Sequence, residues 1–259
     1  MEQVYQHFRK EEQVFIDMVE SWIIQVQGQY SPYLTEFLDP RQQYIVEMLV
    51  GKKGEVRVSF FGGYEAAERK RALLYPEYFE PQQEDYELQL FEIQYPVKFT
   101  QLSHGKILGT LIGSGIKREM FGDIMSDGQR WQFFTAENVS NFVKLQLSRI
   151  GNVSVRLEER DYLDLIQPID DWTIEQDTVT SLRIDTIISS VYNVSRQRAK
   201  ELIIAGKVKL NWALYDRPDF ELGIFDIISI RGYGRIQIRE IQGKSKKDKW
   251  RIEIGVLRK

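Results

Sequence analysis

The chain has 259 residues, of which 42% are hydrophobic, and this length suits two or three domains with packed cores. It contains no cysteine and only two histidines, which excludes a disulfide framework, thiolate chemistry and a histidine-rich metal site, so we expect neither a metal nor a cofactor. The net charge of −3 conceals an asymmetry, since residues 181–259 carry 17 Lys and Arg against 9 Asp and Glu, and the rest of the chain is strongly acidic.

The first segment has the apolar spacing of an amphipathic helix. Six large apolar residues recur at intervals of three and four: Phe15, Met18, Val19, Trp22, Ile23 and Val26. Asp39 and Pro40 then form an N-cap and first-turn pair, which predicts a second helix that reaches Val50.

A strand and a glycine-rich turn follow. The residues EVRVSFF, 55–61, are strand-like, and FGGY, 61–64, forms a turn at their end. This turn cradles a phosphate or merely reverses the chain; no lysine or serine follows at the spacing of a phosphate-binding loop, which favours the plain turn. We predict a short helix from Tyr64 towards Pro76 and, over residues 1–75, a small mixed α/β domain.

The middle segment carries strand and helix signals in the order β-α-β-β-α-β. The run FEIQYPVKF predicts a strand, Ser103 opens a helix, and an Asp127-Gly128 turn joins two strands before a second helix and the strand VSVRLEE. This order is that of the ferredoxin-like arrangement, the framework of many RNA-binding domains. We predict a ferredoxin-like, α+β domain over residues 76–165 as a candidate RNA-binding domain.

Two features of this segment suit RNA. Four aromatic residues fall on its strands and either stack on bases or pack in the core: Phe91, Tyr95, Trp131 and Phe133. Lys117 and Arg118 lie in the glycine-flanked loop GSGIKREMFGD, where we expect a phosphate contact.

An acidic stretch separates the middle segment from the basic one. Pro168, Asp170, Asp171, Glu175 and Asp177 lie in or beside residues 169–180, so we expect an exposed acidic linker that proteases cut, followed by a third domain over residues 181–259.

The third domain opens with two short helices. The isoleucines of SLRIDTIISSVYNV recur at helical spacing, and Ser195 caps a second helix that ends at Gly206. Arg196 and Arg198 lie in its first turn, where positive charge opposes the helix dipole, and Lys200 shares the flank of Arg196. A phosphate near that N-terminus would remove the conflict, so this helix favours a polyanion as partner.

Strands complete the third domain. The stretches KVKLN, DIISIRG, RIQIREIQ and WRIEIGVL each read as a strand, and the last two form a hairpin. Its loop, GKSKKDK, is rich in lysine and is either solvated or in contact with phosphates.

These residues resemble the S4 RNA-binding domain, a small αL unit that holds structured RNA. The resemblance rests on Arg183 to Asp185, on Ser195-Arg196, on LIIAGKVKLN and on GIFDIISI. It implies that the second helix and the following strand hold structured RNA. The candidate RNA-binding residues of this domain are Arg183, Ser195, Arg196, Arg198, Lys200, Lys207, Lys209 and Asn211. Trp212 is a departure, since most S4 domains have glycine there.

Almost the whole chain is similar to the YlmH family of bacterial proteins. The motifs are FLDPRQQ, GGYEAAERKRALLYPEY, GIKREMFGDI, the pair NW and RGYGR. The resemblance implies a three-part, non-enzymatic RNA-binding protein that binds rRNA and tRNA on the large ribosomal subunit, with P-site tRNA, in quality control of stalled translation. It also implies an older association with cell division.

Two other functions remain open. An RNA-modifying enzyme of pseudouridine synthase or methyltransferase type would use the S4 domain for targeting, but Asp185 lacks the glycine-leucine run of the first, and GTLIGSG follows a helix, not the strand that the second requires. A protein-interaction adaptor linked to cell division would instead use the acidic N-terminal part. We expect no enzymatic activity.

The N-terminus predicts the location of the protein. The residues MEQVYQHFRKEEQVF lack the apolar run of a signal peptide, and no stretch of 18 apolar residues follows. We therefore expect a cytoplasmic monomer that does not enter membranes.

Overall fold

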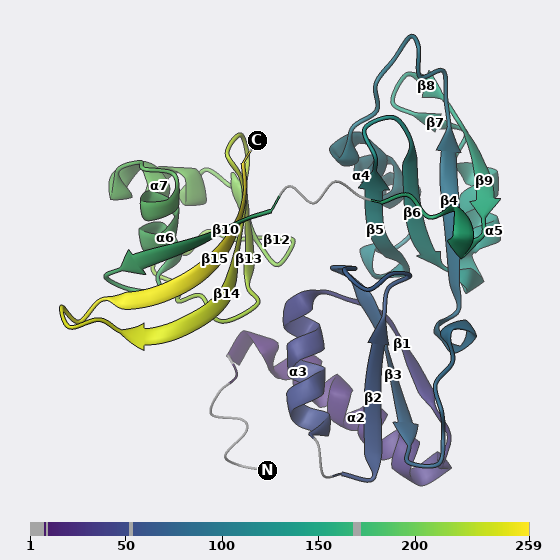
Figure 1. Cartoon of the computed structure of the whole chain (residues 1–259), viewed down its shortest axis with the longest axis horizontal. Coiled ribbons are helices and arrows are strands. Elements are labelled where there is room, and N and C mark those ends of the chain that lie inside the picture. Colours follow the sequence, from purple (N-terminus) through teal and green to yellow (C-terminus); the bar gives the residue numbers. More distant parts are fainter. Residues whose placement is uncertain (1–7, 9, 52–53, 168–171, 259) are drawn as a thin grey trace. The chain divides into compact units, whose positions relative to one another are not determined.

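The computed structural model describes residue 8 and residues 10–51, 54–167 and 172–258. Its contacts divide the chain into two units, Met1–Ile169 and Asp170–Lys259 (Figure 1). Both units are α+β structures built on antiparallel sheets, as predicted for the fold class. Among the described residues, no helix combines the length and the apolar character needed to cross a membrane.

The first sheet carries two helices on one face. Its strands are β1 (Tyr33–Leu38), β2 (Val56–Phe61) and β3 (Lys70–Pro76), in the order β1-β3-β2, and the helices are α2 (Gln13–Gln29) and α3 (Pro40–Val50). The predicted apolar stripe of α2 packs on the sheet through Val19, Trp22 and Val26, whereas Met18 is 46% exposed. Asp39 caps α3 with its carboxylate on the Gln42 N–H, as its sequence indicates.

The helix predicted from Tyr64 to Pro76 is wrong, because β3 occupies the second half of this stretch. β3 is the central strand, and four consecutive residues, Arg71 to Leu74, are buried. A strand that is covered on both faces reads as an unbroken run, which periodicity alone does not distinguish from a helix. β1 was not predicted from the sequence either.

The second sheet has the element order predicted for the middle segment. Its strands are β4 (Leu88–Gln94), β5 (Phe121–Ser126), β6 (Trp131–Ala136) and β9 (Arg156–Arg160), all antiparallel in the order β5-β6-β4-β9. Helices α4 (His104–Gly113) and α5 (Glu137–Gln146) supply Ile107, Leu111 and Val143 to the core on one face. Short elements complete this unit: the strands β7 (Arg149–Ile150) and β8 (Val153–Ser154), and 3-10 turns at Lys10–Glu12, Gln83–Tyr86, Arg118–Met120 and Tyr162–Asp164.

A partly buried carboxylate joins the first sheet to the second. Asp123 in β5 accepts hydrogen bonds from the Tyr64 hydroxyl at 2.8 Å and from the backbone N–H groups of Glu68 and Arg69 at 2.7 and 3.1 Å. The Arg69 guanidinium donates to the carbonyl oxygens of Phe37 and Phe121. The glycine turn before Tyr64 belongs to the same contact, because Gly63, at φ +99°, lies against the Phe134 ring and leaves no room for a Cβ. The turn therefore packs against the second sheet.

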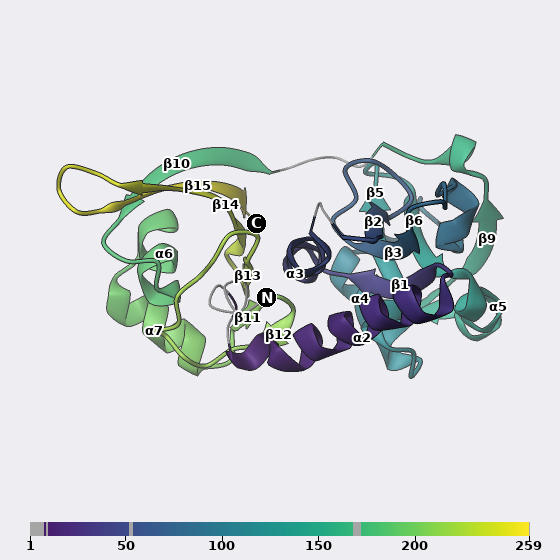
Figure 2. The same cartoon turned by 90° about the horizontal axis from the view of Figure 1, so that it is seen from below.

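The second unit is a six-stranded sheet with two helices on one face (Figure 2). The helices are α6 (Ile184–Val191) and α7 (Arg196–Ile204). The sheet order is β10-β15-β14-β13-β11-β12, with the following bounds: β10 (Thr173–Val179), β11 (Val208–Leu210), β12 (Ala213–Leu214), β13 (Ile227–Ile230), β14 (Gly234–Lys244) and β15 (Trp250–Arg258). Isoleucines and valines of alternate strand positions meet the helices in one core, which fixes the register of the strands that contribute to it.

The prediction of an exposed linker over residues 169–180 is wrong for the part that the structure describes. Residues 173–179 form β10, which pairs along its whole length with β15, and the Glu175 carboxylate forms an ion pair with Arg258. Residues 169–171 lie outside the described part. The polar side chains that indicated a linker are those of an edge strand with one exposed face.

Candidate RNA-binding surface

The basic surface of the second unit begins at the N-terminus of α7. Ser195 caps this helix, and its Oγ accepts a hydrogen bond from the Arg198 N–H at 3.0 Å. At the other end Gly206 adopts φ +65°, and the Lys207 N–H bonds back to the Leu202 carbonyl oxygen. Both ends lie where the sequence predicts them, so the two first-turn arginines project beside the cap.

A buried carboxylate holds two of the predicted RNA-binding arginines. Asp185 in α6 is fully buried and accepts hydrogen bonds from Arg183 Nε and Nη2, each at 3.1 Å. Arg196 Nη2 approaches the two carboxylate oxygens at 3.3 and 3.2 Å. The sequence suggested that a bound phosphate offsets the positive charge in the first turn of α7. In the structure the Asp185 carboxylate offsets part of it by binding Arg196.

Charge, more than burial, sets the state of Asp185. Burial alone would raise the pKa of this carboxyl, but hydrogen bonds from Arg183 and the charges of both arginines outweigh it, and the pKa lies below its ordinary value. The two arginine side chains are 33% and 51% exposed, so each keeps N–H groups directed at solvent. A charged Asp185 thus orients both guanidinium groups at the junction of α6 and α7.

The next cations of α7 are accessible. Arg198 pairs with Glu201 at 3.2 Å, and both side chains are 51% exposed, so a phosphate can replace this weak surface pair. Lys200, one turn after Arg196, forms no ion pair with another described residue.

A second group of cations lines an open groove of about 400 Å³ at the strands that follow α7. It is lined by Gly206, Lys207, Lys209, Leu214, Ser229, Ile230 and Arg231. Sequence reasoning missed Arg231, whose N–H donates to the Lys207 carbonyl oxygen at 2.9 Å and so fixes β13 beside the start of β11. The sequence signal that could have pointed to Arg231 is its position directly before the tight turn of RGYGR.

Asn211, another predicted RNA-binding residue, is used inside the domain. Its Nδ2 donates to Asp226 at 3.0 Å, and its Oδ1 accepts from the Ile227 N–H at 2.9 Å. Asp226 is fully buried and also accepts from the Gly223 N–H. The Asn211 side chain therefore holds the turn between β11 and β12.

The structure separates Lys117 from Arg118. The Lys117 side chain is exposed, but Arg118 turns inward and donates to the carbonyl oxygens of Phe121 and Gly122. Burial, together with the nearby charge of Arg69, lowers the pKa of Arg118 to about 9. Of this pair, only Lys117 is placed to meet a phosphate.

The sheet aromatics of the middle segment pack in the core. Phe91 and Phe133 are fully buried under α4 and α5, and Tyr95 and Trp131 are partly buried against the same core. Base stacking on Phe91 or Phe133 is therefore excluded in this structure, which leaves the alternative of core packing.

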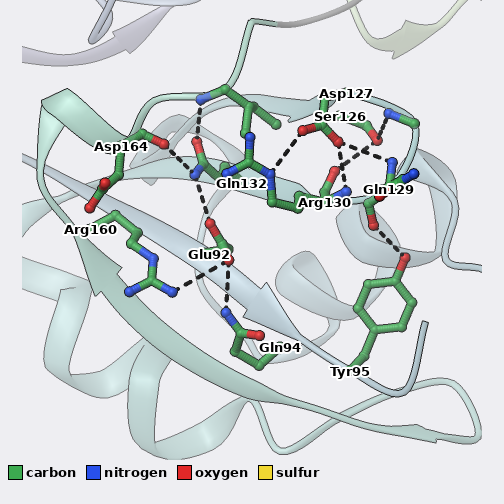
Figure 3. A network of polar contacts seen from close by, with 12 residues as sticks. Glu92, Gln94, Tyr95, Ser126, Asp127, Gln129, Arg130, Gln132, Arg160 and Asp164 are labelled. Carbon is green, nitrogen blue, oxygen red and sulfur yellow. Dashed lines mark hydrogen bonds and ion pairs between the residues drawn. The ribbon is translucent and has the colours of Figure 1, made fainter. Parts of the chain in front are cut away.

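The opposite face of the same sheet carries a closed polar network (Figure 3). Gln132 donates to Glu92 at 3.0 Å and to the Asp164 carbonyl oxygen at 2.9 Å, and Arg160 bonds both Glu92 and Glu158. The Ile166 N–H donates to Gln132 Oε1, so the segment after β9 crosses this face. The carboxylates on this face are already hydrogen-bonded within the protein, and the described residues of the face do not present a row of cations to RNA phosphates.

The β14–β15 hairpin ends in the predicted lysine-rich loop. Lys246, Lys247 and Lys249 are exposed, and Lys244 pairs with Asp248 at 2.7 Å and lies over the Trp250 ring. The exposed lysines of this loop are accessible to water and to phosphates alike.

Three family models match consecutive parts of the chain. They are described as the N-terminal part of YlmH (residues 11–79), a putative RNA-binding domain in YlmH (81–164) and the S4 domain (182–228). Within the described residues, no group of three or more His, Asp or Glu side chains is arranged to hold a metal ion. The second unit is thus an S4 domain with additional strands.

Relatives match most of the chain. The ribosome-associated protein quality control protein P2 of Bacillus subtilis (strain 168) is 44% identical over 252 residues, which are 97% of this chain and 98% of that protein. A solved structure, the cell division protein ylmH from Streptococcus pneumoniae, is 40% identical with a TM-score of 0.55 and covers 63% of this chain and 99% of that one. The chain belongs to the YlmH family.

Proposed function

We propose that this chain is a non-catalytic RNA-binding factor that associates with the large ribosomal subunit and positions structured RNA. The observation that carries the proposal is the pair of exposed cations at the N-terminus of α7, Arg196 and Arg198, to which Lys207 and Lys209 add a groove on the following strand. Cations beside a helix N-terminus form a geometry suited to phosphates. The name of the Bacillus subtilis relative supports the ribosome and quality control as the setting, and a cytoplasmic monomer acting on rRNA and P-site tRNA fits it.

The first unit, Met1–Ile169, is called the acidic unit below, and it has a supporting role in this proposal. Its second sheet, in the order β5-β6-β4-β9, has the strand order of a ferredoxin-like domain, and we assign residues 76–165 to that fold, beside the domains 1–75 and 181–259 with β10 added to the last. Lys117 is its candidate contact with RNA. When one of two weak phosphate-binding sites on the same chain binds an RNA, it raises the effective concentration of that RNA at the other site.

One observation favours the adaptor as a second candidate. A groove of about 500 Å³ in the acidic unit is lined by Glu84, Glu87, Glu137 and Asp161, with Leu163 95% exposed beside them. Such a surface suits a basic protein segment.

Salt-dependent binding of the full chain to a structured RNA tests the proposed function. Phosphate contacts release counterions, so the logarithm of the affinity should fall steeply with the logarithm of the salt concentration. The triple variant Arg198→Gln, Lys200→Gln, Lys207→Gln should flatten this slope, by about 0.7 to 0.9 for each phosphate that is no longer neutralised. Arg183 and Arg196 are left intact because they hold Asp185.

A matched control removes three exposed cations from the other unit through Lys144→Gln, Arg149→Gln and Arg156→Gln. We expect it to keep the wild-type slope. An unchanged slope in the first variant, or an equal reduction in the control, would contradict the assignment of the surface.

A further inference from the structure

The C-terminal sheet has a second face, which α6 and α7 do not cover. Strand pairing places Lys209, Ser229, Arg235 and Leu257 in one row across β11, β13, β14 and β15. Their chain neighbours Val208, Ile228, Ile236 and Val256 are fully buried in the core beneath the helices. Because successive side chains of a strand alternate, the row lies on the opposite face.

Two tryptophans lie on this face beside an arginine. The Arg235 guanidinium carbon is 5.4 Å from the centre of the Trp172 ring and 5.8 Å from that of Trp212. Both rings are partly exposed. Arg239 lies next to Trp172 over Gly255, where a Cβ would come within 2.9 Å of its Nε, and this buried Nε has no hydrogen-bond partner among the described residues. Two arginines and two tryptophans thus lie together on this face of the sheet.

The groove of Lys207 and Lys209 opens beside this patch. Ser229 lines the groove and is the direct neighbour of both Lys209 and Arg235 in the sheet. Neither lysine nor Arg231 forms an ion pair with another described residue. Only Ser229 therefore separates Lys209 from Arg235, which contacts both aromatic rings. The carboxylates of Glu240 and Glu253 lie further along the hairpin.

The backbone at Trp212 gives an independent argument. Trp212 has φ +67° and follows Asn211 at φ +45°, so a bulky residue occupies the left-handed region that glycine adopts without strain. Strain at a single position persists where the surrounding structure enforces it, and it is frequent at binding sites. A tryptophan at such a position indicates that the ring itself is needed.

We propose that this face, which extends the RNA-binding role proposed above, takes one unpaired nucleotide of an RNA, with the base stacked on Trp212 and its phosphates held by Lys209 and Arg231. Stacking on an aromatic ring suits any base and needs a base free of its helix. The cations beside the ring match the phosphates, and the groove of about 400 Å³ is of nucleotide size. The face therefore adds recognition of an unpaired base to the phosphate contacts of α7.

The test compares two hairpin RNAs that differ by a single bulged 2-aminopurine nucleotide. The full-length wild-type protein should bind the bulged RNA about tenfold more tightly than the fully paired one and should quench the emission of the 2-aminopurine. Trp212→Gly removes the ring and relieves the backbone, so this variant should keep its melting temperature and its affinity for the paired RNA, and lose both the preference and the quenching. Arg235→Lys keeps the positive charge but removes the planar guanidinium group, so it should reduce the preference for the bulged RNA in part.

A control variant, Trp250→Leu, removes a tryptophan from the lysine-rich end of the hairpin and should leave the preference intact. Equal affinity of the wild-type protein for the two RNAs, or a preference that survives Trp212→Gly, would overturn this inference and leave the proposed function standing. Failure of the wild-type protein to bind either RNA at low salt would overturn both.

Discussion

Two carboxylates, the partly buried Asp123 and the fully buried Asp185, differ in the side chains that surround them. Burial raises the pKa of Asp123, and the nearby charge of Glu68 raises it further, against hydrogen bonds from the backbone and Tyr64. At Asp185 two arginines outweigh burial and lower the pKa. Asp185 is thus a charged anchor for cations that face solvent, whereas Asp123 is a backbone acceptor inside a contact between sheets.

We expect Asp185→Asn to lower the free energy of unfolding by about 2 kcal/mol at neutral pH. Removing one partner of a buried pair costs roughly 3–5 kcal/mol, and the partial exposure of both arginines reduces this. Because the folded pKa of Asp185 is lowered, its contribution is present above the ordinary pKa of about 3.9 and is lost as the pH falls through the folded value.

Urea unfolding of both proteins at several pH values measures this difference. The curves of the wild type and the variant should converge below about pH 4. Glu201→Gln, at the exposed pair with Arg198, is the control and should change stability by less than about 0.5 kcal/mol. A difference independent of pH would show that the charge of Asp185 is not what stabilises this junction.

The contact at Asp123 gives a second prediction. Asp123→Ala leaves the backbone N–H groups of Glu68 and Arg69 and the Tyr64 hydroxyl without their acceptor, so we expect the free energy of unfolding to fall by about 3 kcal/mol. Amide hydrogen exchange should accelerate first at residues 62–70. Glu119→Ala, an exposed neighbour in the sequence, should leave exchange there unchanged.

At the scale of elements, the sequence predicted those structures that local chemistry determines. The Asp39 and Ser195 caps, the Asp127-Gly128 hairpin and the β-α-β-β-α-β order are all present in the structure. β3 and β10 were not predicted. The central strand β3 lacks alternation and the edge strand β10 is mostly polar, so that only their partners determine them.

β10 leads to a prediction about where the second unit can be divided. A fragment of residues 172–259 contains the edge strand, whereas one of residues 181–259 exposes the long unpaired edge of β15. We expect the longer fragment to be monomeric with a cooperative melting transition, and the shorter one to melt at a lower temperature and to associate. Size-exclusion chromatography and circular dichroism compare them. Identical behaviour would mean that β10 adds nothing to the sheet.

In the candidate site, too, local sequence predicted some features, and contacts between distant residues determine the others. The sequence indicated the cations of α7 and β11, since composition and helix periodicity place them, but not which of them the fold itself uses. Arg118 and Asn211 hold backbone and turn groups, and Arg196 binds Asp185. These roles depend on contacts between residues distant in sequence, which no local pattern contains. Arg231 and Arg235 were missed because strand register alone brings them to the groove and the tryptophans.

For the whole molecule, we expect the full chain to sediment with large ribosomal subunits and Lys117→Ala to weaken this association a few-fold. Lys117 is an exposed cation on the acidic unit, and a second weak site multiplies the first through effective concentration. The RNA affinity of the fragment 172–259 should not depend on this change. Association that survives removal of the α7 cations as well would favour the adaptor function.

The pairing of β10 with β15 has a consequence for the order in which the chain folds during synthesis. β10 is the first strand of its sheet to be made, but its neighbour is the last of the described strands. The acidic unit can fold while synthesis continues, since its sheets are completed by residue 160. The RNA-binding domain, in contrast, acquires its full sheet only after Trp250–Arg258 have left the exit tunnel, so a nascent chain interrupted shortly before that point presents an unpaired β10 and an incomplete sheet.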